Sequence, residues 1–102
     1  MKQCFQSDSP CPAIHLGSCV PYERIAVRTL RTNYELVVLP GDSGDVLVRG
    51  GRYFEEFRRA RLAGSSFGGN WLRVMTIEVG CRLEFQVDGA RIVTSQIQAV
   101  ER

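Results

Sequence analysis

Three of the four cysteines and the only histidine of the chain lie within its N-terminal segment. They are Cys4, Cys11, His15 and Cys19. Three thiols and one imidazole can enclose a tetrahedral zinc ion, and a metal would give an otherwise irregular segment a reason to be ordered. The spacing lacks the Cys-x-x-Cys pair that makes zinc motifs specific. The alternative, which the sequence favours, is a set of unpaired thiols, or one disulfide in an oxidising compartment.

The fourth cysteine offers little for catalysis. Cys81 follows Gly80 at the start of an expected strand, a position typical of a small buried apolar side chain. A nucleophilic cysteine needs a neighbouring base, and nothing in the sequence links Cys81 to the single histidine. The chain also has no phosphate-cradling loop and no paired catalytic motif. We therefore expect that the protein is not an enzyme, and the sequence indicates no particular cofactor.

A second candidate segment, residues 50–61, combines arginines with aromatic residues. Its four arginines are interleaved with Tyr53, Phe54 and Phe57, a mixture that can grip phosphates and stack on bases. Two glutamates in the same segment cancel half of that positive charge, and the net charge of the whole chain is only +2. The sequence therefore favours aromatic residues that plug the end of a barrel, and it argues against a nucleic-acid partner.

Two separated motifs form a third candidate. Arg24 and Arg28 have the form Arg-x-x-x-Arg, and the stretch Gly-Ser-Ser-Phe-Gly-Gly at 64–69 is similar to Asp/Asn-x-Ser-x-x-Gly. In this order they resemble the signature of the PilZ domain, a small bacterial β-barrel that binds cyclic di-GMP. The resemblance implies that both arginines hold phosphate and stack on guanine, while Ser66 and Gly69 contact the ligand from the barrel wall. Trp71 begins a continuation that also resembles this family, and we count it as a candidate ligand contact.

A broader resemblance covers most of the chain after Tyr22. The stretch Gly-Gly-Arg-Tyr-Phe at 50–54 and the closing Val-Thr-Ser-x-Ile at 93–97 resemble small bacterial all-β proteins of uncharacterised activity. This resemblance implies a fold and a bacterial origin, but it implies no activity.

Short strands must position these residues, because apolar and polar side chains alternate along most of the chain. The clearest element is a hairpin from Arg82 to Ser95, in which Asp88-Gly89 predicts a tight type I′ turn. One segment, Tyr53–Arg59, has aromatic residues at i, i+1 and i+4, which predicts a short helical insertion. Further strands are expected over residues 24–30, 34–39, 45–49, 61–67 and 71–77.

The expected fold is therefore all-β, a small antiparallel barrel or sandwich of six to seven short strands with one short helical insertion. We expect an irregular N-terminal arm over residues 1–21 and a single β domain over residues 22–102. The predicted core consists of Ile25, Val27, Leu36, Val38, Val46, Val48, Phe54, Leu62, Leu72, Val74, Ile77, Leu83, Phe85, Val87, Ile92, Val93 and Ile97.

Size and composition bound the function. A chain of 102 residues, 44% hydrophobic, builds one domain with a modest core. It has no apolar run long enough to span a membrane and no secretory leader, so we expect a cytoplasmic protein. The leading hypothesis is a non-enzymatic binding or assembly module that forms a homodimer through its strand edges. The alternative is a PilZ-like cyclic di-GMP receptor, which would bind a small anionic ligand.

Overall fold

The computed structural model describes residues 13–67 and 71–102, and this part of the chain is almost entirely β-structure. The all-β prediction is confirmed. The elements are β1 (Ala13–His15), the single-turn 3-10 helix η1 (Leu16–Ser18), β2 (Arg24–Thr29), β3 (Asn33–Val38), β4 (Asp45–Gly50), β5 (Phe54–Ser66), β6 (Leu72–Val74), β7 (Thr76–Glu78), β8 (Arg82–Val87) and β9 (Ala90–Glu101).

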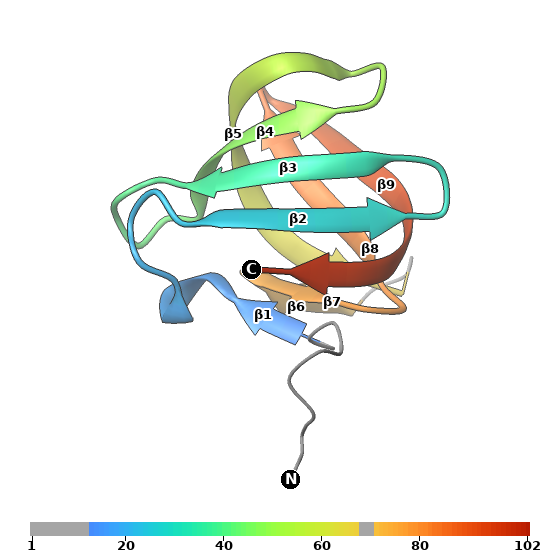
Figure 1. Ribbon diagram of the computed structural model, residues 1–102, viewed down its shortest axis with the longest axis horizontal. Coiled ribbons are helices and arrows are strands. Elements are labelled where there is room, and N and C mark those ends of the chain that lie inside the picture. Colours follow the sequence, from blue (N-terminus) through green and yellow to red (C-terminus); the bar gives the residue numbers. More distant parts are fainter. Residues whose placement is uncertain (1–12, 68–70) are drawn as a thin grey trace, which may run out of the picture.

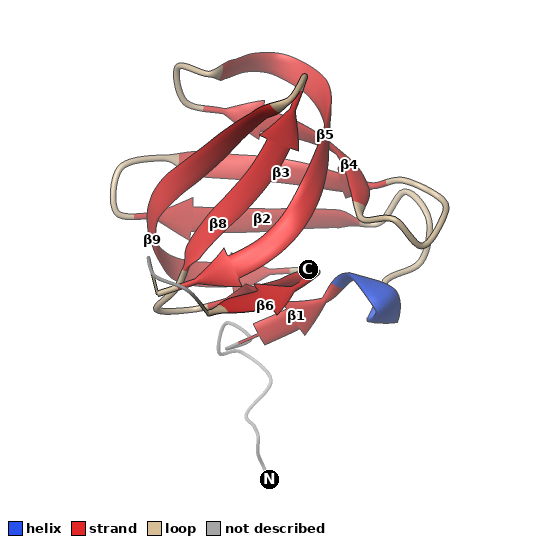
Figure 2. Cartoon of the chain, turned by 180° about the vertical axis from the view of Figure 1, so that it is seen from behind, coloured by secondary structure: helices blue, strands red, loops and turns tan. Residues whose placement is uncertain are grey.

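Six of the strands close into an antiparallel barrel (Figure 1). The main sheet has the order β4-β3-β2-β9-β8-β5-β6, and a further pairing between β4 and β5 joins its two sides. The long strand β5 therefore pairs with β4 through its first half, while its second half pairs with β6. Seen from behind, β5, β8 and β9 form the near wall (Figure 2). The extra strand β6 ends the sheet beyond β5.

The N-terminal segment contributes to this structure from residue 13 onward. Strand β1 pairs with β7 in a separate two-stranded sheet. Ile14 and Leu16 are both buried in the barrel core. The alternation of exposed and buried residues that identifies a strand is limited here to three residues, which is too short a pattern to recognise in the sequence.

Most of the predicted core is confirmed, and Phe54 and Phe85 pack edge to face at its centre, with ring centroids 5.5 Å apart. Cys81 is fully buried, as expected. Further buried side chains that the prediction omitted are Ala60 and Val100. The predicted core residues that are indeed buried are Ile25, Val27, Leu36, Val38, Val46, Val48, Phe54, Leu62, Ile77, Leu83, Phe85, Val87 and Ile97.

Three core predictions, Leu72, Val74 and Val93, are wrong, because these side chains are exposed. Directly paired residues of an antiparallel sheet share a face. Val74 lies opposite Gly64, Gly64 opposite Glu84, and Glu84 opposite Val93. Since the neighbours of Glu84 along β8 point into the core, this whole row points outward. A bulge in β5 between Leu62 and Gly64 shifts the register of this row, which the alternation of residue types did not reveal.

The predicted helix at Tyr53–Arg59 is also wrong. Phe54 begins strand β5 and fills the core, whereas Tyr53 lies in the preceding turn and is partly exposed. Phe57 lies on the outer face of the barrel beneath Arg49, whose guanidinium carbon is 4.5 Å from the ring centroid. Pairing with β4 satisfies the backbone along this segment. Tertiary pairing therefore outweighs a local aromatic spacing that also suits a helix turn.

The Asp88-Gly89 hairpin is confirmed. Val87 pairs with Ala90, so the loop has two residues. Asp88 and Gly89 both have positive φ, 51° and 81°, as a type I′ turn requires.

Candidate functional site

The first arginine of the PilZ-like pair is engaged on the outer wall formed by β2, β3 and β4. The Nη1 atom of Arg24 lies 2.7 Å from Glu35, and Arg49 lies 2.5 Å from the other oxygen of the same carboxylate. These two guanidinium groups, Arg49 foremost, hold the pKa of Glu35 below its ordinary value. Arg24 therefore shares one carboxylate with Arg49.

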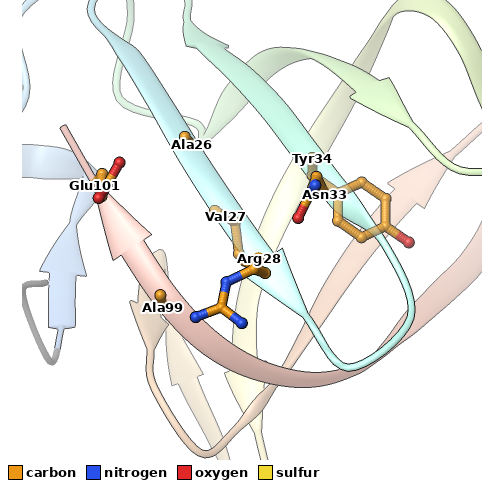
Figure 3. Close-up of a pocket in the computed structure, with 7 residues that line it drawn as sticks. All are labelled: Ala26, Val27, Arg28, Asn33, Tyr34, Ala99 and Glu101. Carbon is orange, nitrogen blue, oxygen red and sulfur yellow. The ribbon is translucent and has the colours of Figure 1, made fainter.

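The second arginine, Arg28, lies at an open pocket of about 270 Å³ on the same side of the barrel. Figure 3 shows its guanidinium extending from β2 toward β9, where Ala99 is its direct pairing partner. Among the described residues, no carboxylate forms an ion pair with Arg28, although Glu101 also lines this pocket. Arg28 can therefore reach an anion without first breaking an ion pair.

Ser66 has a different role. Its hydroxyl is buried and donates a hydrogen bond of 2.5 Å to Glu84. Arg91 donates to the other oxygen of that carboxylate at 2.9 Å, and this hydrogen bond is the main cause of the lowered pKa of Glu84. The Ser66 hydroxyl and the Glu84 carboxylate are both buried and bonded to each other. Ser66 therefore belongs to a polar cluster on the outer face of the barrel wall.

The structure does not bring the PilZ-like residues together. Strands β2 and β5 are three steps apart in either direction around the six-stranded barrel, so they lie on opposite walls (Figure 1). Arg24 and Arg28 lie on one wall, and Ser66 and Trp71 lie beside the other. Gly69 lies outside the described residues. Binding of cyclic di-GMP stays a prediction.

Of the candidate zinc ligands, the structure describes His15 and Cys19, whereas Cys4 and Cys11 lie outside the described residues. The His15 Nδ1 atom accepts a hydrogen bond of 2.9 Å from the backbone of Gly17. An imidazole bound to a metal through Nε2 carries its proton on Nδ1 and cannot accept there. Partial burial and the nearby carboxylate of Glu23 raise the pKa of the Cys19 thiol, which disfavours the thiolate that zinc needs.

The sequence analysis missed the most exposed apolar surface. Phe67, which directly follows β5, has 71% of its surface exposed, and Trp71, which precedes β6, is 74% exposed. Leu72 and Val74 on β6 itself are 38% and 63% exposed. We call these four residues the hairpin surface. The residue types did not indicate this exposure, because apolar side chains in a strand are expected to point into the core.

The edge of β6 adds backbone groups to this surface. Among the described strands, β6 pairs only with β5. Gly64 is required at their junction, because its φ is +148° and a Cβ atom there would lie 2.1 Å from the carbonyl oxygen of Arg73. Arg73, at the centre of β6, forms an ion pair of 2.8 Å with Glu78. The edge strand therefore carries a neutralised charge between two exposed apolar side chains.

Comparisons of this chain with protein-family models, with curated proteins and with solved structures found no match. The function must be argued from the surface itself. Within the described residues, no helix is long and apolar enough to cross a membrane.

Proposed function

We propose that this protein is a non-enzymatic assembly module that pairs with a second copy of itself through β6 and the hairpin surface. The observation that carries the proposal is the exposure of Phe67, Trp71, Leu72 and Val74 at and beside one edge strand. Monomeric proteins rarely leave such neighbouring apolar groups uncovered. An edge strand also presents unpaired N–H and C=O groups that another strand can satisfy.

A second copy is the occupant that fits best. A two-fold axis through Arg73 would pair β6 antiparallel with itself, and each Leu72 would then lie opposite Val74 of the other copy. Arg73 would face its own equivalent, but the ion pair with Glu78 neutralises each of these charges. Because β6 has only three residues, most of the binding energy must come from the aromatic side chains of Phe67 and Trp71.

The compartment is part of the same proposal. Cys19 and Cys81 are free thiols in the described part of the chain. Free thiols are typical of a reducing compartment such as the cytosol, and this is where we expect the module to act.

Light scattering from micromolar to millimolar protein tests the proposal. We expect the apparent mass to rise from the 11.4 kDa of one chain toward twice that value. Val74→Lys should keep the protein monomeric, because two lysines would face the apolar interface. Val20→Lys is a matched control, since Val20 is 64% exposed but lies far from β6 in the chain. A wild-type protein that stays monomeric at millimolar concentration, or two variants that behave alike, would contradict the proposal.

A cyclic di-GMP receptor remains the second candidate, and the pocket beside Arg28 is the observation that favours it. A guanidinium without a carboxylate partner can hold one phosphate of the ligand. Calorimetry should then detect binding that weakens when Arg28 becomes Ala, with Arg52→Ala as an exposed control. Absence of binding heat would eliminate this candidate.

A further inference from the structure

A second pocket, with a more polar lining, opens at the end of the barrel and shares Tyr34 with the pocket beside Arg28. It has a volume of about 370 Å³ and lies between the β2–β3 turn, the first residue of β8 and the bulged part of β9. Arg31 and Arg82 both line it, together with Thr32, Gln96 and the phenol-bearing Tyr34. The volume is at the lower end of the range for small-molecule sites.

The charge at this pocket is unbalanced. Seven of the twelve arginines of the chain form ion pairs, namely Arg24, Arg49, Arg58, Arg59, Arg73, Arg91 and Arg102. Arg31 and Arg82 do not pair with any carboxylate of the described residues. No acidic residue among those described lines the pocket either. Two arginines therefore line one cavity without the counter-charge that most arginines of this protein have.

The pocket wall is held by hydrogen bonds between elements that are distant in the chain. The Ser95 hydroxyl on β9 accepts from the backbone N–H of Arg31 at 3.2 Å and donates to Thr29 at 2.9 Å. The Thr94 hydroxyl accepts from the backbone N–H of Leu83, the residue after Arg82, at 3.0 Å. These bonds fix the backbone positions of both arginines before any ligand arrives. A pre-organised site loses less conformational entropy on binding.

We propose that this pocket binds a phosphate group carried by a small molecule, with Arg31 and Arg82 as its two guanidinium ligands. Planar guanidinium groups bind phosphate oxygens through paired, charge-assisted hydrogen bonds. Thr32 also lines the pocket, and the amide nitrogen of Gln96 donates to the carbonyl oxygen of Gly80 at 2.9 Å, which holds this part of the wall in place. This site uses none of the residues of the hairpin surface, so phosphate binding can be tested independently of self-association.

The test is a titration with inorganic phosphate and with glycerol 3-phosphate at constant ionic strength, followed by the Nε–Hε signals of the arginines in ¹H–¹⁵N spectra. We expect saturable shifts at Arg31 and Arg82. Arg31→Gln or Arg82→Gln should each weaken binding about tenfold, the loss expected for one charge-assisted hydrogen bond. Arg52→Gln is the control, because Arg52 is exposed and lines neither pocket described above.

Vesicles with and without phosphatidate separate two sources of the phosphate group. Equal affinity for soluble glycerol 3-phosphate and for phosphatidate vesicles identifies a free ligand, and a strong preference for the vesicles identifies a lipid headgroup. Either result supports the site when both arginine variants lose it. Shifts spread evenly over all arginines, or an equal loss in Arg52→Gln, would overturn the proposal.

Discussion

Two aromatic side chains on the outside of this barrel have opposite surroundings. Phe57, on the wall formed by β3, β4 and the first half of β5, is half-buried and covered by Arg49 at 4.5 Å. Arg24, whose guanidinium carbon is 6.0 Å from the same ring centroid, is tied to Glu35. Trp71, beside β6, is 74% exposed, and no arginine of the described residues lies over its ring.

The two rings differ in whether charged side chains cover them. On the Phe57 wall, the guanidinium groups of two arginines lie over an apolar ring and share the carboxylate of Glu35. The hairpin surface contains no such arrangement, because the only arginine on β6 turns its charge to Glu78. The exposed ring of Trp71 is therefore consistent with the proposed dimer, in which the second copy would cover it.

The largest expected effect comes from the junction that holds β6 in place. Gly64→Ala would put a Cβ atom 2.1 Å from the carbonyl oxygen of Arg73 at a φ of +148°. We expect a loss of about 3 kcal/mol in the free energy of unfolding, measured with urea, together with loss of self-association. Gly80→Ala is the control: its φ is also positive, but a Cβ atom there meets open space, and the cost should be about 1 kcal/mol. Equal costs would mean that β6 is not anchored at Gly64.

The comparison of the two aromatic residues gives the second prediction. Trp71→Ala should change the free energy of unfolding by less than about 0.5 kcal/mol, because the side chain makes few contacts within one chain. It should weaken dimerisation by about 2 kcal/mol, more than tenfold in Kd. Phe57→Ala should do the reverse, with a loss of about 1–2 kcal/mol in stability and an unchanged Kd.

Fluorescence checks the same prediction in the wild-type protein. Trp71 is the only tryptophan of the chain, so its emission should shift to shorter wavelength as protein concentration rises and the indole becomes buried. An emission maximum that is independent of concentration would show that Trp71 stays in water.

The sequence predicted the barrel because side chains alternate between the two faces of a strand, and buried residues recur at every second position in much of β2, β3, β4 and β8. It predicted the Asp88-Gly89 turn because that turn depends on local backbone preference alone. It failed where pairing between distant strands decides the outcome. Phe54 and Phe57 were assigned to a helix because the prediction used only their spacing in the sequence. Their actual conformation depends on the pairing of β5 with β4, which the sequence spacing does not show.

The candidate site was harder to predict than the fold for the same reason. Leu72, Val74 and Val93 are apolar residues in alternating strands, and only the register with Gly64 and Glu84 turns them outward. Registers of this kind depend on bulges, which no residue type marks reliably. The sequence also did not predict which arginines lack a carboxylate partner, because most of the ion pairs join residues on different strands.

The smallest predicted effect concerns the polar cluster of Ser66, Glu84 and Arg91 on the outside of the β5–β8–β9 wall. Arg91→Gln should lower the free energy of unfolding at neutral pH, because the buried carboxylate of Glu84 then loses its charge-assisted hydrogen bond, while the exposure of Arg91 keeps this loss below the effects predicted above. Arg91 and Ser66 lower the pKa of Glu84 below its usual value near 4.5. The carboxylate therefore contributes stability that is complete above that value and is lost as the pH falls through its lowered pKa.

The difference in unfolding free energy between the wild-type protein and Arg91→Gln should accordingly be largest at neutral pH and shrink as the pH falls below about 4.5. Arg58→Gln is the matched control, since Arg58 pairs with Asp88 on an exposed turn and should cost little at any pH. A constant difference across this range would mean that Arg91 stabilises the wall by packing alone. In that case the ion pair between Arg91 and Glu84 would add no pH-dependent stability, and the two walls of the barrel would differ only in how their aromatic residues are covered.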